Sequence, residues 1–588
     1  MFVRESSVKV GDTTHRYVQI VESYRDENGR TKQRTLLSLG NKEKLDPAAV
    51  DRLLHSLARY GTCLPLPRPD APRTAAEGFD PGLGVRQDRA FGSLYVLDRL
   101  WKDLGLRDLF RSFAAGRRFG HDLERATFAM VANRLIEPLS KLSTETWLDR
   151  EAYFPTPMAE PLNADQLYAT LQWLHQERED LEVAIHQRLR RRHLTGATVY
   201  FYDTTLSHFE GRGPEELAQI TARKGALRGK RHVLVGLVTT SDGWPVMHHV
   251  YPGRTNDLTT FKHVLRELYD RFGLRDIVII CDRGMHSAEI VKLLEEEFKF
   301  RYIVATKLRR AKEVDEQVLA RAGRYREVEP GLDVKQVWVE ERRHVVCRSA
   351  EAAARDMNRR AEIVAQLAEA LGPDGLDPES KKAMKLRTSA QDRYLCVRDG
   401  RLVINESAVD RDSRYDGKWV LRSNLRELDP GKIALRYKDE ARIERDIRTI
   451  KSFVELRPTR HRLEETVDGH VFVCVLALLL YRYLQERLGT WPADRESVEA
   501  VLKELGSIRA QELRVGAEDG KPEYFWTRSD LSAAQQDLLK RLGVSGLPRN
   551  LSAPPSLDDR IKDHTQQLRH RRRKRPRSAT CPDTEAAH

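Results

Sequence analysis

The sequence predicts an α/β protein with a central sheet and with helical regions before and after it along the chain. Three observations predict this fold class. Short apolar stretches of strand length lie in the middle of the chain, helical patterns alternate with the later ones, and helical periodicity dominates on both sides. Because 588 residues exceed one compact core, we expect about three or four domains.

The N-terminal region 1–61 is predicted to be a β-hairpin followed by a helix. Apolar and polar residues alternate in HRYVQIVESYR and TKQRTLLSLG, and the Asn28-Gly29 pair between them is typical of a tight hairpin turn. A Pro-rich linker is expected at 62–84, and residues 85–195 then have the apolar spacing of helices.

Residues 196–306 have the element order of a ribonuclease H-like sheet, in which three successive strands precede alternating helices and strands. The expected elements are a strand at 197–203 that ends in Asp203, a hairpin of 232–240 and 244–252, a helix at 257–272, a strand at 276–282 that ends in Asp282, a helix at 286–298 and a strand at 300–306. We therefore predict a ribonuclease H-like core.

The remainder of the chain is predicted to interrupt this core and then complete it. In 307–430, charged helical segments are interleaved with strands such as KQVWVEE and HVVCRS, which indicates a β-rich insertion. Helical periodicity resumes at 431–490, expected to be the second part of the core, and 491–550 is expected to form a C-terminal domain. The tail 551–588 is low in apolar residues and strongly basic (RHRRRKRPR), so we expect it to be disordered.

The composition favours a polyanionic partner and argues against several other classes of protein. The chain has 101 Lys and Arg against 88 Asp and Glu, a formal net charge of +13, although a basic soluble protein without such a partner remains an alternative. Six cysteines without a CxxC pair argue against a zinc knuckle or a disulfide framework. The absence of GxGxxG and GxxxxGK[ST] gives no support to nucleotide chemistry. No secretory signal begins the sequence, and the longest apolar stretch, 471–481, is about half a membrane span. We expect a cytoplasmic protein with no membrane partner.

Two aspartates, Asp203 and Asp282, follow apolar strands of the predicted sheet. If the two strands are neighbours, both carboxylates project into one small volume, where divalent cations such as Mg²⁺ or Mn²⁺ relieve their repulsion. The alternative is that each aspartate only caps a turn.

The predicted helix at 437–453 carries a third carboxylate. Tyr437, Glu444 and Lys451 are each seven residues apart, so they follow one stripe of the helix. A tyrosine, a carboxylate and a lysine suit a metal ion and a phosphate backbone better than a core. An exposed helix face with ion pairs is the alternative.

This helix resembles the signature of bacterial insertion-sequence DDE transposases. The resemblance is to the branch of the insertion-sequence-four type, marked by tyrosine, two residues, arginine, three residues, glutamate, six residues and lysine. Tyr437, Glu444 and Lys451 match, whereas Glu440 stands in the place of the arginine. Other similar stretches are RYVQIVESYRDENGRTKQRTLLSLG, DTT at 203–205 and DGKWVLRSN at 416–424, so the resemblance covers roughly residues 5–490.

The resemblance implies a ribonuclease H-like catalytic core in which Asp203, Asp282 and Glu444 hold two divalent metal ions, Mg²⁺ or Mn²⁺. One ion activates water or a DNA 3′-hydroxyl, and the other stabilises the leaving oxygen. The reaction implied is cleavage at transposon ends followed by strand transfer into target DNA.

The same resemblance implies DNA-binding roles. Tyr437 and Lys451 are expected to contact DNA, and Arg442, Arg445 or Arg448 are candidates to replace the missing arginine. Trp419 is a candidate to stack on a flipped base, with a buried core position as the alternative. Independently of the resemblance, their charge makes RKGALRGKRH (223–232), RPTRHR (457–462) and LRRRH (189–193) candidates for backbone contacts, with a solvated face as the alternative for each. The region 85–195 is expected to bind the DNA ends.

The partners implied are double-stranded DNA, both the terminal inverted repeats and the target, and a second copy of the chain in a synaptic homodimer. Two alternatives remain open: a metal-dependent nuclease on the same fold, and a domesticated DNA-binding relative without activity.

Overall fold

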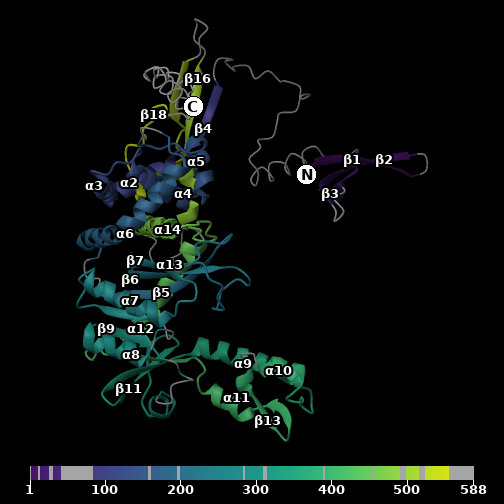
Figure 1. Ribbon diagram of the computed structural model, residues 1–588, viewed down its shortest axis with the longest axis vertical. Helices are drawn as coiled ribbons and strands as arrows, with labels where there is room; N and C mark the ends of the chain where they lie inside the picture. Colours follow the sequence, from purple (N-terminus) through teal and green to yellow (C-terminus); the bar gives the residue numbers. More distant parts are fainter. Residues whose placement is uncertain are drawn as a thin grey trace, which may run out of the picture. The chain divides into compact units, whose positions relative to one another are not determined.

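A computed structural model describes the chain in two compact units, Met1–Asp80 and Pro81–His588 (Figure 1). The residues that it describes are 2–10, 13–25, 31–41, 84–156, 161–194, 199–281, 285, 287–306, 308, 314–387, 391–452, 454–489, 498–515 and 523–554. The expected helix at 46–60, the linker and most of the basic tail lie outside them.

The second unit contains both strands and helices. Its strands are β4 (Gly84–Ala90), β5 (Val199–His208), β6 (His232–Thr240), β7 (Pro245–Pro252), β8 (Val278–Cys281), β9 (Arg301–Ala305), β10 (Arg326–Glu329), β11 (Leu332–Val339), β12 (Arg342–Ser349), β13 (Leu395–Arg398), β14 (Arg401–Ile404), β15 (Lys418–Ser423), β16 (Arg509–Val515), β17 (Glu523–Arg528) and β18 (Asn550–Leu551). Its α-helices are α2 (Gly92–Asp103), α3 (Leu106–Ala114), α4 (Leu123–Ile136), α5 (Lys141–Arg150), α6 (Ala164–Arg192), α7 (Asp257–Asp270), α8 (Ala288–Lys292), α9 (Ala350–Leu371), α10 (Lys381–Arg387), α11 (Glu406–Ser413), α12 (Pro430–Lys438), α13 (Glu440–Ser452), α14 (Glu464–Leu488), α15 (Val498–Gly506) and α16 (Ala533–Arg541). Short helical turns are η3 (Leu293–Glu297), η4 (Val314–Leu319) and η5 (Asp392–Tyr394).

The first unit contains an antiparallel sheet of β1 (Phe2–Val10), β2 (Thr13–Arg25) and β3 (Thr31–Asn41), in that order. The pairing of β2 with β3 runs to Arg25↔Thr31, which confirms the hairpin predicted around Asn28-Gly29. The strand β1 was not expected, since FVRESSVKV mixes polar and apolar residues without the length of a clear alternating pattern.

A nine-stranded sheet forms the centre of the second unit, in the order β10-β11-β12-β15-β9-β8-β5-β6-β7. The strands β5, β8 and β9 are parallel to one another, whereas β6 and β7 extend the sheet antiparallel from β5. Three consecutive antiparallel strands followed by two parallel crossover strands are the ribonuclease H-like order, so the predicted fold class is confirmed.

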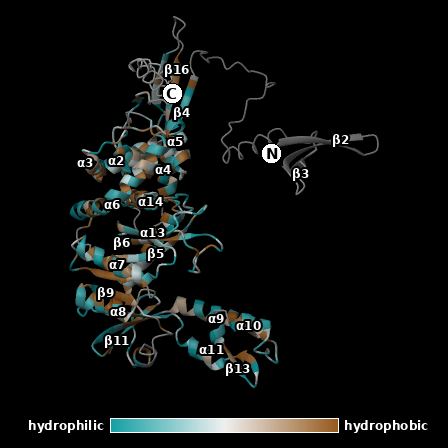
Figure 2. Cartoon of the chain, viewed as in Figure 1, coloured by the Kyte–Doolittle hydropathy of each residue, from teal (hydrophilic) through white to brown (hydrophobic). Residues whose placement is uncertain are grey.

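Helices cover both faces of this sheet. Side chains of a strand point alternately to opposite faces. Tyr200 and Tyr202 of β5 accordingly pack in a core with α7 and α8, while Val199 and Phe201 pack in the larger core that includes α13 and α14. Every residue of β6 is buried, as expected of a strand covered on both faces. Figure 2 shows polar and apolar residues alternating along helices such as α6 and α7, as helices with one face on a core require.

The larger core continues from the sheet into a layer of helices formed by α2 to α6, α14 and α15. The central helix α14 contacts α4, α6 and β7. It is 25 residues long with a mean hydropathy of 1.6 over its most apolar window, of which 94% is buried inside the unit. By length and composition it could cross a membrane, but this burial is that of a core helix. It is longer than the apolar stretch 471–481 suggested.

A buried polar network joins this helical layer to β7. Glu182 on α6 accepts hydrogen bonds from the backbone N–H of His248 at 2.9 Å and from Arg271 at 2.9 Å, and its Oε1 lies 2.8 Å from Nδ1 of His248. On α14, Asp468 lies 2.7 Å from Nδ1 of His175. Because ionised groups stay buried only when they are paired, these contacts fix how α6, α14 and β7 pack together.

The helical pattern expected from residue 85 is wrong for its first residues. Residues 84–90 form the strand β4, which pairs antiparallel with β16 in a sheet of order β18-β17-β16-β4. The sequence GVRQDRA lacks apolar alternation, and the strand exists because a partner more than 400 residues away supplies its hydrogen bonds.

The insertion at 307–430 adds both strands and helices. The strands β10, β11, β12 and β15 extend the core sheet beyond β9. Between β12 and β15 the chain forms the 22-residue helix α9, then α10, the β13-β14 hairpin and α11, which share a small core of their own around Leu367 and Tyr394 (Figure 1).

Candidate active site

Asp203 lies inside β5 and not at its end. The strand runs on to His208 because β6 pairs with it along its whole length, with Asp203 opposite Leu237. The parallel neighbour β8 pairs with β5 only as far as Tyr202↔Cys281. The sequence prediction that the strand ends at Asp203 is therefore wrong, but Asp203 does mark the point where β8 stops.

The Asp203 carboxylate is half-buried, and the next residue, Thr204, points to the opposite face of the sheet. Oδ1 of Asp203 accepts a hydrogen bond from the backbone N–H of Thr204 at 2.7 Å. The hydroxyl of Thr204 donates to Asp257 at 3.1 Å, and Asp257 also pairs with Arg223. By strand alternation Asp203 shares the face of Phe201, the face that α13 covers.

The helix α13 packs on β5 through three buried isoleucines, Ile443, Ile447 and Ile450. Their spacing of four and three residues makes one apolar stripe, so the neighbouring positions of α13 point away from the sheet. Glu444 and Arg448 are accordingly exposed. The buried Asp446 forms an ion pair with Arg482 of α14, which anchors α13 on its other side.

Lys451, in the last turn of α13, lies in the electrostatic field of Asp203. Burial lowers the pKa of its ammonium group, Arg457 lowers it further, and the Asp203 carboxylate acts in the opposite direction. Two of the predicted site residues, from segments almost 250 residues apart, are thus brought together.

The prediction that Tyr437, Glu444 and Lys451 lie along one helix is wrong for Tyr437. The chain turns at Asp439, so Tyr437 belongs to α12, while Glu444 and Lys451 belong to α13. The two helices separate because α12 packs on β11 and β12 of the insertion, whereas α13 packs on β5 and α14. Tyr437 is half-buried against the same large core.

Trp419 lies on the same face of the sheet as Asp203 and toward the same edge. It belongs to β15, opposite Cys347 of β12, and it packs against the large core together with Leu421. Its ring is half-buried, and its buried indole N–H has no hydrogen-bond partner among the described residues. Trp419 therefore combines core packing with an unused donor.

The two candidate arginines of α13 point in different directions. Arg448 is exposed. Arg445 is half-buried and lies close enough to Arg482 of α14 for its charge to contribute to lowering the pKa of Arg482, after burial. Arg445 is thus directed toward α14, and Arg448 toward solvent.

The donor set present suits a hard divalent cation. Asp203 offers a half-buried carboxylate at the level of the sheet where β8 stops, and hard cations prefer carboxylate oxygens. Asp282, the residue after Cys281, lies outside the described residues. No cluster of three possible metal ligands occurs among the residues that the structure does describe.

Comparison with known proteins identifies the family. The transposase DDE domain family matches residues 195–480, a range that includes Asp203, Asp282 and Glu444. The IS1634 family transposase N-terminal domain matches residues 3–64. The chain belongs to the DDE transposases of insertion sequences. No curated protein matches the sequence of this transposase significantly.

A solved structure is also similar to part of this transposase. It is the Mos1 transposase paired-end complex with left transposon end, at 11% sequence identity and a TM-score of 0.14. The match covers 33% of this transposase and 64% of the Mos1 chain, so it spans less than two thirds of that chain.

A segment of the transposase after α13 lies along the strand that carries Asp203. Thr459 donates its backbone N–H to the carbonyl of His208 at 2.9 Å, and the Ser207 hydroxyl lies 3.0 Å from that of Thr459. This contact brings the basic stretch 457–462 to the end of β5. It also brings that stretch to Arg134 and Lys141 of the helical layer, which no sequence pattern singled out because NRLIEPLSK resembles any amphipathic helix end.

Proposed function

We propose that this transposase cleaves DNA at transposon ends and transfers the freed strand into target DNA in a divalent-metal-dependent reaction. The observation that carries the proposal is the approach of Lys451 on α13 to Asp203 on β5, inside a matched DDE domain. A carboxylate for the metal and a cation for the DNA backbone then lie at one edge of the sheet.

We assign Asp203, Asp282 and Glu444 to the binding of two Mg²⁺ or Mn²⁺ ions. When bound, such ions supply an activated oxygen nucleophile and stabilise the leaving oxygen. The carboxylates hold the ions, α13 presents Glu444 from a helix fixed on both sides, and Lys451 neutralises a phosphate next to the reacting one.

Other residues on this face are proposed to position DNA. Tyr437 and the exposed Arg448 contact the backbone, with Arg445 as the alternative cation, and Trp419 stacks on a base displaced from the duplex. These roles complete the signature of the insertion-sequence-four type, with Glu440 in the place of its arginine.

The proposed partners are the terminal inverted repeats, target DNA and a second copy of the transposase. The formal charge of +13 favours duplex DNA as partner through counterion release. A homodimer is proposed because two ends must be cut together, and the cytoplasm is proposed as the compartment.

The experiment is a cleavage and strand-transfer assay with Mg²⁺ or Mn²⁺ on a duplex that carries the DNA flanking the reading frame. Wild type is expected to cut and join, and Asp203→Asn and Glu444→Gln to lose at least about 100-fold of either activity, as removal of charge stabilisation at a reacting centre does. Glu464→Gln, an exposed glutamate at the start of α14, is the matched control and should remain active.

The outcomes separate the alternatives. Cutting without joining would identify a nuclease on the same fold. Tight DNA binding without cutting would identify an inactive relative. Equal activity of wild type and Glu444→Gln would refute the assigned role of Glu444.

A further inference from the structure

A small pocket in the helical layer is lined by more cationic side chains than carboxylates. It lies between the end of α4, the start of α5 and the segment 455–461, with Tyr168 of α6 and His470 of α14 on its walls. Its volume is about 110 Å³. The charged side chains that line it are Arg134, Lys141, Arg457 and Arg460 against Glu455 alone.

Lys141 is the most unusual of these groups. Its side chain is 3% exposed, and it makes no hydrogen bond or ion pair within the part of the chain that the structure describes. Burial and the neighbouring Arg134 lower the pKa of Lys141 to about 7. A buried ammonium group without a partner costs stability, and such a cost is commonly retained where a ligand supplies the missing charge.

Arg134 also lines this pocket and is 5% exposed. Its two Nη atoms donate to the carbonyls of Leu139 and Glu455, and its Nε has no partner among the described residues. Lys141 and Leu142 are the first two residues of α5. The first backbone hydrogen bond of this helix is donated by Thr144 to the carbonyl of Ser140, so the N–H groups of Lys141 and Leu142 can donate to another acceptor. A helix N-terminus with buried cations beside it is a favourable place for an anion.

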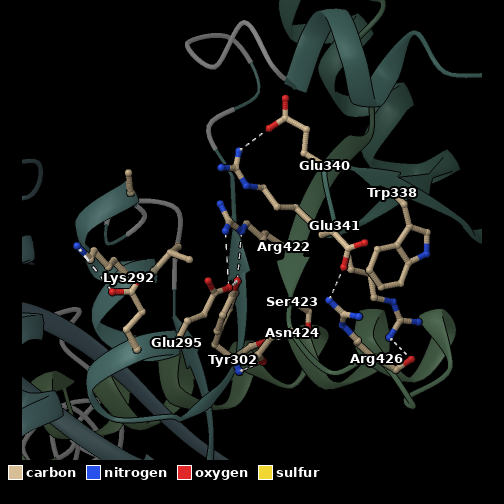
Figure 3. Close-up of a pocket in the computed structure, with 15 residues that line it drawn as sticks. Lys292, Glu295, Tyr302, Trp338, Glu340, Glu341, Arg422, Ser423, Asn424 and Arg426 are labelled. Atoms are coloured by element: carbon tan, nitrogen blue, oxygen red, sulfur yellow. Dashed lines mark hydrogen bonds and ion pairs between the residues drawn. The ribbon is translucent and has the colours of Figure 1, made fainter.

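A larger pocket of the transposase differs in this respect. Figure 3 shows that pocket, about 620 Å³ in volume, between η3, β9, β15 and the β11-β12 turn. Four of the five cations that line it are paired with its own carboxylates, as in Arg422 with Glu295 and Arg426 with Glu341. It therefore has little excess charge to offer an anion, in contrast to the pocket at Lys141.

Location indicates which anion fits. Arg457 lines the pocket and also helps to lower the pKa of Lys451, which the Asp203 carboxylate raises. Thr459, in the same segment, hydrogen-bonds to the end of β5. One buried water requires about 10–15 Å³, so a pocket of 110 Å³ has room for a group of several heavy atoms. A DNA strand bound across Asp203 would bring its phosphates to the rim of this pocket.

We infer that the pocket formed by Arg134, Lys141, Arg457 and Arg460 binds one backbone phosphate of the DNA strand that lies across Asp203. The inference rests on the proposed function, and it extends DNA binding into the helical layer before the DDE domain. Lys141 and Arg134 supply positive charge from inside the pocket, and the first N–H groups of α5 donate to the phosphate oxygens. Arg457 and Arg460 contact the phosphate from the rim of the pocket.

The test measures equilibrium binding of a fluorescent duplex carrying the flanking DNA, without divalent metal, over a series of salt concentrations. In Lys141→Met the slope of log affinity against log salt is expected to decrease by about 0.9, the contribution of one phosphate contact. Lys540→Met, an exposed lysine of α16, is the matched control and should keep the wild-type slope. Arg460→Gln, on the exposed rim, is the second variant and should also reduce the slope. An unchanged slope in both pocket variants would overturn the inference.

Two further measurements test the site itself. Wild-type affinity for the duplex should fall as the pH rises from 6 to 8, since Lys141 loses its proton there, and Lys141→Met should lose this component. The other charged or titratable groups that line the pocket or act on Lys141 are Arg134, Tyr168, Glu455, Arg457, Arg460, His461, His470 and Cys474. Inorganic phosphate, compared with chloride at equal ionic strength, should raise the Tm of wild type and not of Lys141→Met. Stabilisation by phosphate with an unchanged DNA slope would mean that the pocket takes free phosphate, against the inference.

The two proposals fail separately. Binding without metal does not require the catalytic carboxylates. If wild type neither cuts nor joins DNA but Lys141→Met reduces the slope, only the proposed reaction fails. If Glu444→Gln abolishes cleavage and Lys141→Met binds DNA as wild type does, only the inference about the pocket is refuted.

Discussion

The ion pair between Asp446 and Arg482 should be essential for holding α13 in place. Asp446 is fully buried and Arg482 is 5% exposed, so neither group can turn to water if its partner is removed. The substitution Asp446→Asn keeps the shape of the side chain and removes only its charge.

Two estimates of the cost agree. Removing one member of a buried ion pair typically costs about 3–5 kcal/mol. The Coulomb attraction of two unit charges about 4 Å apart at an effective dielectric constant of about 20 is about 4 kcal/mol. We therefore expect Asp446→Asn to lower the free energy of unfolding by about 4 kcal/mol.

The assay is urea unfolding of the full chain, with hydrogen exchange of the α13 amides as a local measurement. Faster exchange in α13 is expected, together with loss of strand cleavage, because Glu444 and Lys451 are carried by this helix. Glu464→Gln is the control and should change the unfolding free energy by less than about 0.5 kcal/mol. The double variant Asp446→Leu with Arg482→Met should recover most of the loss, since an apolar pair of similar size replaces the charges. A loss below about 1 kcal/mol for Asp446→Asn would refute this account of the anchor.

Two substitutions test the packing around the site. The pKa of Lys141 in the folded chain, about 7, is below the usual 10.5, so the unfolded chain binds more protons between these values and stability rises with pH there. Below pH 7, Lys141→Met should therefore be more stable than wild type by about 5 kcal/mol, and this difference should vanish near pH 10.5. Thermal unfolding over a series of pH values measures the difference. A variant less stable than wild type at neutral pH would contradict this account. A Cβ on Gly469 would lie 2.2 Å from the carbonyl oxygen of Leu171, so Gly469→Ala should push α14 from α6 and cost about 1–3 kcal/mol or more in urea unfolding. Gly506→Ala, where the nearest atom is 3.8 Å away, should be neutral or stabilising, and equal effects at both glycines would disprove the close approach.

The sheet could be predicted because its order depends on local patterns. The strands around Asp203, the 232–252 hairpin and the parallel pair β8 and β9 are short apolar stretches with clear turn residues, and their sequence order leaves one common topology. The hairpin around Asn28-Gly29 could be predicted for the same reason.

Other features depend on contacts that no local pattern reveals. The strand β4 is polar and owes its conformation to β16, and α12 separates from α13 at Asp439 because the two helices pack on different strands. In the candidate site, seven-residue spacing singled out Lys451, whose pKa the Asp203 carboxylate does affect. The proposed roles of Lys141 and Arg134 could not be predicted, because the pocket forms only when 455–461 packs against the end of α4 and the start of α5.

The pairing of β4 with β16 also bears on what happens to shortened copies of the gene. A premature stop anywhere before residue 509 would remove the whole partner of β4. The DDE domain, which ends by residue 480, would still be encoded, yet its product would display an unpaired strand edge beside an incomplete helical layer. Such a product is expected to aggregate or to be degraded. The fold thereby couples integrity of the reading frame to the presence of a usable enzyme.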